Sequence, residues 1–193
     1  MSTAVAGRSA FTVPSFRRLW AAGLISDIGD WFLYIALPVV VLQLGGRAGG
    51  TALAFLLELA PPVLLAPLAS RLVARLPRRA LMVAMNAGQA LALVPLAFVH
   101  SSAQLPIVYA VIVLHSALAT VFEPAKNTLM PDLVGPDHLV SANALVGLNQ
   151  NLGRLVGGPL GGVVLLGGGL GMVALADAAS YLVSAALIAT IRS

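Results

Sequence analysis

The sequence contains no cysteine and very few charged residues. Without cysteine, the chain has no disulfide framework, no thiol chemistry and no zinc site built on thiolates. Only 9% of its 193 residues are charged, whereas soluble domains carry about 25%. Hydrophobic residues make up 59%, and so little polar surface cannot cover them in water. The composition therefore predicts an integral membrane protein whose solvent is lipid.

A transmembrane helix needs about 20 mostly apolar residues, and the sequence offers six such runs. One helix made of the last two runs would be far too long for a bilayer of about 30 Å. We therefore expect a turn at 167–169, where three glycines separate these runs. The predicted fold class is an all-α integral membrane protein with six transmembrane helices. The expected spans are Leu19–Leu44, Thr51–Val73, Ala80–Val99, Leu105–Phe122, Leu139–Leu166 and Leu170–Ile191.

Basic residues orient these spans, because cytoplasmic loops carry an excess of Lys and Arg. The loops opposite the chain ends hold only Arg47, and Arg154 lies inside the fifth span. Both termini are therefore expected in the cytoplasm, with the chain in the cell (inner) membrane. Residues 1–18 would be a cytoplasmic segment without a secretory signal. The longest loop is expected at 123–138, with a short amphipathic piece and a turn at "VGPDH", residues 134–138. The basic residues on the side of the termini are Arg8, Arg17, Arg18, Arg71, Arg75, Arg78, Arg79, Lys126 and Arg192.

Away from the ends of the expected spans lie five charged side chains, and each costs at least about 2.5 kcal/mol there. Asp30 and Glu58 are candidates for binding a substrate or carrying protons, since desolvation favours the neutral form of a carboxylate. Arg154 is either part of this polar site or a structural partner, with Asp30 as the expected counterion. Asp27, one turn before Asp30, is expected in a vestibule. Asp177 is expected to be structural.

Other polar residues carry weaker signals. Asn149 begins an "NQN" run in an apolar helix, and such amides either bond across helices or contact a substrate. His115 is expected to be a hydrogen-bonded packing residue. No residues show metal-ligand spacing, and no nucleophile motif or phosphate-binding loop is present. We therefore expect no metal, no cofactor and no enzymatic activity. Arginines without interleaved aromatic residues also give no reason to expect nucleic acid as a partner.

Four segments of the sequence carry a family resemblance. In chain order they are "FRRLWAAGLISDIGDWFLYIALP", "PLASRLVARLPRRALMV", "VFEPAKNTLMPDLVGPDHLVSANAL" and "GRLVGGPLGG". Together they resemble the N-terminal half of a major facilitator superfamily transporter, of the drug and siderophore exporter type. The fourth is similar to that family's antiporter motif in the fifth helix. Small residues there let another helix lie against the backbone, and a proline allows a bend. The matching residues are Gly157, Gly158, Pro159, Gly161 and Gly162.

The second segment departs from the family's cytoplasmic loop signature. Ser70 occupies the position of the signature's glycine, and Ala74 occupies the position of its aspartate. The residues that still match the signature are Arg75, Arg78 and Arg79. The acidic partner in the family's gating network is thus missing from this loop. The resemblance also covers one six-helix half, whereas family members have two. Three explanations stay open: a fragment, a separate second half, or a homodimer that restores the cavity.

The resemblance implies a secondary transporter that exports small molecules, coupled to protons, as an antiporter of the multidrug kind. Its six helices would form two inverted three-helix repeats, with repeat one at 19–100 and repeat two at 101–193. Partners would be a small-molecule substrate, the lipid bilayer and a second half or second copy. The alternative is a membrane bundle that transports nothing, or that acts only with a separate second half.

Overall fold

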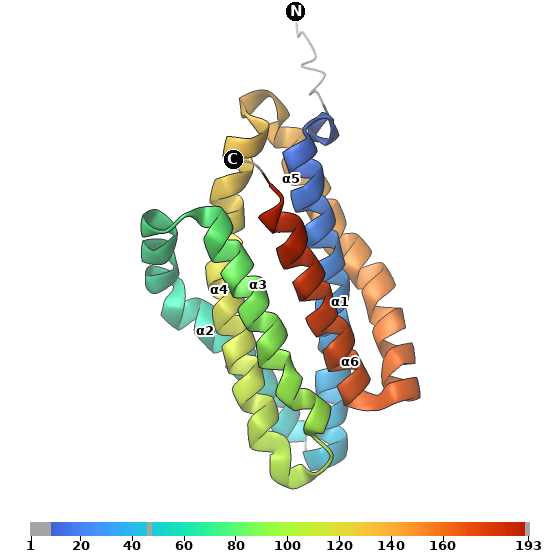
Figure 1. Ribbon diagram of the computed structural model, residues 1–193. Helices are drawn as coiled ribbons and strands as arrows, with labels where there is room; N and C mark the ends of the chain where they lie inside the picture. Colours follow the sequence, from blue (N-terminus) through green and yellow to red (C-terminus); the bar gives the residue numbers. More distant parts are fainter. Residues whose placement is uncertain (1–8, 46–47, 192–193) are drawn as a thin grey trace, which may run out of the picture.

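The computed structural model describes residues 9–45 and 48–191, and every regular element within them is helical. This confirms the predicted all-α class. Short 3₁₀ segments cap or join several helices, and a π-helical turn, Gly153–Gly157, leads from α5 directly into α6. The α-helices, shown in Figure 1, are α1 (Pro14–Gly45), α2 (Ala48–Arg75), α3 (Arg78–Leu93), α4 (Leu105–Val134), α5 (Leu139–Leu152) and α6 (Gly158–Ala189).

Five segments of the described residues are long and apolar enough to cross a membrane. The last of them, Pro136–Ala189, contains 54 residues. Its backbone leaves the helical conformation at Gly169, where φ is 68° and ψ is −172°. Figure 1 shows the chain reversing direction in this segment, so that its two arms run antiparallel. The expected turn therefore falls at the third of the three glycines, where a positive φ suits a residue without Cβ. Six crossings remain a prediction, since they require each arm to cross the bilayer by itself.

The loop expected at 123–138 is wrong in its length, because α4 continues to Val134. In this stretch Ala125, Leu129 and Met130 are buried in the core. Ala125 and Leu129 lie four residues apart, as do Met130 and the buried Val134, and a spacing of four places both members of a pair on one face of a helix. Burial of these faces stabilises the helix beyond the apolar run. Gly135, with φ at 70°, then ends α4. The expected turn at 134–138 is confirmed, since the chain turns at Gly135 and Pro136–His138 before α5 begins.

The helices enclose two apolar clusters, one at each end of the bundle. The cluster beside the described termini includes Phe16, Met82 and Leu129. The cluster at the opposite end includes Leu33 and Leu93. Between them, α1, α3, α4 and α6 each contribute polar side chains. This polar layer comprises Ser26, Asp30, Asn86, Gln89, His115, Ser116, Asp177, Tyr181 and Ser184.

Helix α2 lies at the edge of the bundle, where it packs mainly against α4. Its outer face is apolar and exposed, with Val63 at 76% and Leu64 at 73%. Pro61, Pro62 and Pro67 lie inside this helix, and each removes one backbone N–H from the helical hydrogen-bond pattern. An apolar face of this kind suits lipid or another apolar helix bundle.

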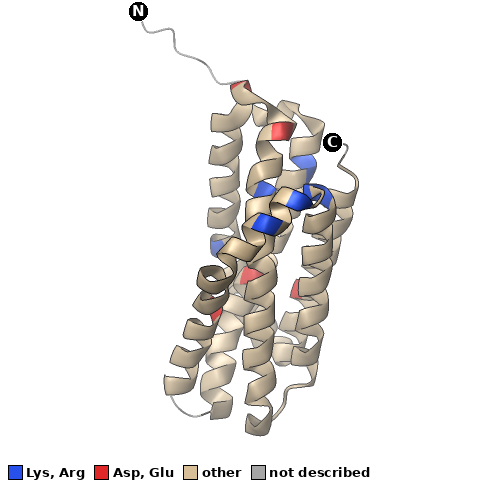
Figure 2. Cartoon of the chain, turned by 90° about the vertical axis from the view of Figure 1, so that its left-hand side faces the viewer, with Lys and Arg blue, Asp and Glu red and all other residues tan. Residues whose placement is uncertain are grey.

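Basic residues gather towards the end of the bundle that holds the described termini (Figure 2). The junction of α2 with α3 and the turn between α4 and α5 lie at the same end (Figure 1). The basic residues that the charge pattern assigned to one side of the membrane thus lie at one end of the bundle, among those that the structure describes. The side of the membrane that this end faces stays a prediction, and Arg8, Arg47 and Arg192 lie outside the described residues.

Candidate functional site

A cavity of about 680 Å³ opens between α1, α2 and α4, with Gln89 of α3 and Tyr181 of α6 at its inner wall. Its volume lies within the range of about 300–1,000 Å³ typical of small-molecule sites. Apolar residues such as Leu33, Phe55 and Val111 form much of the lining. A mostly apolar wall with a few polar groups is the usual composition of a ligand pocket.

The charges in this cavity are mainly negative. Four acidic residues line it (Asp27, Asp30, Glu58 and Glu123), and Lys126 is the one basic residue among the lining residues of the described chain. Lys126 already forms an ion pair with Glu123, with 2.7 Å between Nζ and Oε1. The remaining carboxylates have no basic partner among the described residues. The sequence prediction that Asp27, Asp30 and Glu58 share a polar region is consistent with this arrangement.

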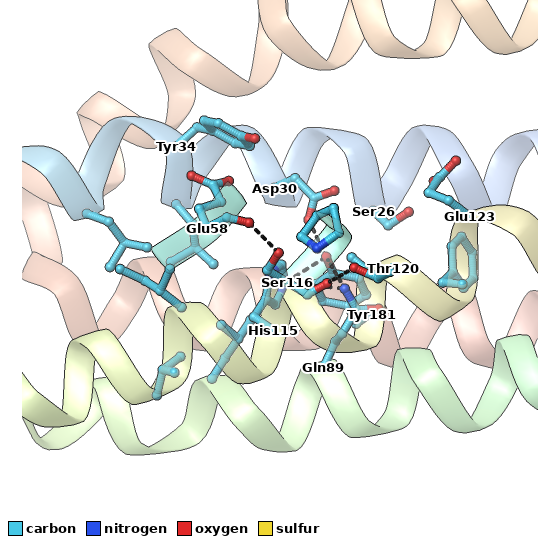
Figure 3. Close-up of a pocket in the computed structure, with 18 of the residues that line it drawn as sticks. Ser26, Asp30, Tyr34, Glu58, Gln89, His115, Ser116, Thr120, Glu123 and Tyr181 are labelled. Carbon is cyan, nitrogen blue, oxygen red and sulfur yellow. Dashed lines mark hydrogen bonds between the residues drawn. The ribbon is translucent and has the colours of Figure 1, made fainter. Parts of the chain in front are cut away.

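The position of Glu58 follows from a proline one helical turn later. In an α-helix the carbonyl of residue 58 would accept from the N–H of residue 62, but Pro62 has none. Ser116 of α4 supplies the missing donor, with its Oγ 2.6 Å from the Glu58 carbonyl oxygen. Figure 3 shows this contact between α2 and α4. The bond fixes the helix turn that carries the Glu58 side chain at the cavity.

Asp30 belongs to a hydrogen-bond network that joins four helices and has the Tyr181 hydroxyl at its centre. It accepts a hydrogen bond from the Tyr181 hydroxyl. The same hydroxyl oxygen lies 2.9 Å from His115 Nε2 and accepts from Gln89 Nε2 at 3.0 Å. These side chains point towards one another in Figure 3. His115 is therefore hydrogen-bonded, as the sequence led us to expect, and it also faces the cavity.

The structure does not bring Arg154 and Asn149 to the cavity. Arg154 is exposed and donates to Asn151 at 3.3 Å, so the expected pair with Asp30 is not formed. Asn149 is 3% exposed and donates to the carbonyl of Trp20 in α1 at 2.8 Å. Asn149 thus links α5 to α1, which matches the structural alternative for these amides. The π-helical turn changes the helical register here, and sequence periodicity does not reveal such a change.

Only some residues of the glycine motif need to be glycine for steric reasons. A Cβ at Gly157 would lie 2.5 Å from the Ile28 carbonyl oxygen, and one at Gly161 would lie 2.6 Å from the Cα of Phe32. Gly162 has nothing within 4 Å, and Gly158 has only ordinary contact. Pro159 occupies the second position of α6. The motif therefore acts mainly as a contact surface for the backbone of α1.

The arginines at the start of α3 have their acidic partner on another helix, α4. Arg78 pairs with Asp132 near the end of α4. Arg79 donates to the carbonyl of Ala189 at the end of α6. Arg75 is the last residue of α2. The loop lacks its own aspartate at Ala74, yet its arginines still tie together the ends of three helices.

Sequence reasoning missed the roles of Tyr181, Gln89 and Ser116. Asp177, Tyr181 and Ser184 follow one another at spacings of four and three residues, so they share one face of an apolar helix. That polar stripe was the available signal for Tyr181. Ser116 gave no comparable signal, because its role depends on a proline in a different helix.

Comparison with known proteins agrees with this architecture. The family model of the Major Facilitator Superfamily matches residues 19–192. A protein of Bacillus subtilis (strain 168), described as "Uncharacterized MFS-type transporter YfiS", is 26% identical over 171 residues. That match covers 88% of this chain and 40% of the relative, so the chain spans well under half of the relative's length. By its match over nearly all of its length, the chain belongs to the Major Facilitator Superfamily of membrane transport proteins.

Proposed function

We propose that the chain is one lobe of a secondary transporter that exports small, cationic, partly apolar molecules through the cavity between α1, α2 and α4. The observation that carries this proposal is the excess of carboxylates over basic groups in that cavity. Apolar walls favour the body of such a substrate, and the carboxylates favour its charge. This chain matches 40% of the length of its B. subtilis relative, which supports one lobe of a two-lobed carrier.

Within this proposal, Glu58 exchanges a coupling proton for the substrate. Its side chain has no ion pair among the described residues, and its carbonyl is held by Ser116. Asp30 and Asp27 add negative charge to the same cavity. A carboxylate that binds either a proton or an organic cation couples the two fluxes, because occupancy by one excludes the other. The gradient of protons would then supply the energy for export.

The second lobe would cover the open side of the cavity. Exposed apolar residues on α1, α2 and α5 surround that region, among them Ile35, Leu59 and Leu148. Exposed apolar side chains on membrane helices contact lipid or another helix bundle. A second six-helix half or a second copy of this chain would supply such a surface. The alternative is a membrane bundle that transports nothing, or a subunit that acts only with a separate second half.

Transport is tested in inverted membrane vesicles that contain the chain. An imposed proton gradient should drive accumulation of tetraphenylphosphonium, a lipophilic cation, in the wild type. Glu58→Gln should abolish the gradient-dependent part, whereas Asp137→Asn, which changes an exposed acid in the turn after α4, should not. Gradient-driven accumulation that Glu58→Gln leaves intact would contradict the proposal. Binding without any accumulation would favour the non-transporting alternative.

A further inference from the structure

Three potential metal ligands from three helices meet in the polar layer. They are Asp30 of α1, His115 of α4 and Asp177 of α6, and their ligand atoms all lie within 4.8 Å of one another. Atoms bound at about 2.0–2.2 Å to one ion lie at most about 4.4 Å apart. Three atoms that lie up to 4.8 Å from one another would reach a common ion at this bond length after shifts of up to about 0.8 Å each. Sequence spacing could not show this group, because its members are separated by 85 and 62 residues.

Asp177 has an oxygen without a partner. The residue is 0% exposed, and its Oδ1 accepts from Ser180 Oγ at 3.1 Å. Its Oδ2 is buried and has no hydrogen-bond partner. A buried carboxylate needs a counterion or further hydrogen bonds to offset the loss of water. No Lys or Arg of the described chain forms an ion pair with it.

Gln89 gives a second, independent sign of a missing ligand. Its side chain is 3% exposed, and its Oε1 is also buried without a partner. Its Nε2 donates to Tyr181 and lies 3.4 Å from His115 Nε2. Rotation of the amide by half a turn exchanges oxygen and nitrogen, and would turn the oxygen towards His115. In that orientation the amide offers an oxygen ligand beside the imidazole of His115.

The packing of α1 against α6 brings the two carboxylates together. Gly29 lies next to Asp30 in α1, and a Cβ built on it would collide with the side chains of Asp177 and Ser180. Glycine at this position therefore allows α6 to place Asp177 beside Asp30. Tyr181 donates to Asp30 and contacts His115, so its hydroxyl fixes the orientation of these two side chains relative to each other.

The geometry points to a binding site for one divalent transition-metal ion, such as Mn²⁺ or Zn²⁺, at Asp30, His115 and Asp177, with Gln89 as a further oxygen ligand. Two carboxylates balance the charge of a divalent ion, and the imidazole favours a transition metal over Ca²⁺ or Mg²⁺. The cavity is lined by Asp30, His115 and Gln89, so an ion can reach the site through the cavity. The site concerns binding alone and does not depend on the proposed transport.

Metal binding is tested on the full 193-residue chain in detergent after treatment with a chelator. Mn²⁺ alone is titrated while free Mn²⁺ is followed by electron paramagnetic resonance, and Zn²⁺ alone is then added as a competitor. We expect saturable binding of one ion per chain, displaced by Zn²⁺. Asp177→Asn and His115→Gln should each weaken binding at least tenfold. The matched controls, Asp137→Asn and His100→Gln, change exposed residues and should bind as the wild type does.

Two results would overturn the site. One is the absence of saturable binding of either ion to wild-type chain that elutes as a folded species. The other is binding by His115→Gln with the affinity of the wild type. His115→Gln keeps a hydrogen-bonding side chain and removes no buried charge, so it decides the question even where Asp177→Asn fails to fold.

Discussion

Gly157 of the π-helical turn lies against Ile28 of α1, so that a Cβ built on it would sit 2.5 Å from the Ile28 carbonyl oxygen. Real Cβ atoms do not approach a backbone oxygen this closely, and a side chain at 157 would force the two helices apart. Gly162, five residues later, has open space around it. These two glycines of one motif therefore differ in their physical role.

Gly157→Ala should lower the stability of the chain, while Gly162→Ala should not. We expect a loss of about 1–3 kcal/mol for Gly157→Ala, the usual cost of overpacking. Alanine favours helix over glycine, so Gly162→Ala should leave the unfolding midpoint unchanged or slightly higher. Thermal unfolding in detergent, followed by circular dichroism, measures both. Equal midpoints for the two variants would contradict the assigned contact.

Ser116→Ala should destabilise the chain because it leaves the carbonyl of Glu58 without a donor. An unsatisfied buried acceptor costs about 1–3 kcal/mol. Pro62→Ala should rescue much of this loss, since it restores the N–H that the helix itself would provide. The double-mutant cycle of these two changes is measured by unfolding in detergent. Ser70→Ala is the control, because the Ser70 hydroxyl bonds within its own helix at an exposed position. A simple sum of the two single effects, without rescue, would count against this explanation.

Tyr181→Phe should cost more stability than Tyr109→Phe. The Tyr181 hydroxyl contacts Asp30, His115 and Gln89 in the buried network. The Tyr109 hydroxyl makes a longer bond of 3.3 Å to the Gly50 carbonyl. Removal of a hydroxyl that serves several buried groups should cost about 1–3 kcal/mol. Unfolding midpoints of the two variants decide between a central and a peripheral role for Tyr181.

The ion pair of Arg78 with Asp132 should contribute little to stability. The two side chains are 41% and 60% exposed, and exposed pairs are worth about 0–1 kcal/mol. Asp132→Asn should therefore shift the unfolding free energy by less than about 1 kcal/mol, and added salt should reduce the shift further. A larger effect that persists in high salt would show that this contact does more than join two helix ends.

Apolar length and glycine chemistry allowed much of the fold to be predicted from the sequence. The turn at Gly169 follows from three glycines between two long apolar runs. The site was predictable only where charge marked it, at Asp30 and Glu58. Arg154 was placed incorrectly beside Asp30, because the position of a residue along its helix does not specify which face packs against the neighbouring helix. The association of Asp177 with His115 depends on how α4 and α6 pack, which no local pattern specifies.

The most direct test of the central claim measures equilibrium binding of tetraphenylphosphonium to the purified chain and to its Glu58→Gln variant. The account predicts saturable binding by the wild type, and at least tenfold weaker binding once the carboxylate at 58 becomes an amide. Asp137→Asn should bind as the wild type does. Equal affinity of wild type and Glu58→Gln would contradict the claim that the cavity between α1, α2 and α4 recognises a cationic substrate.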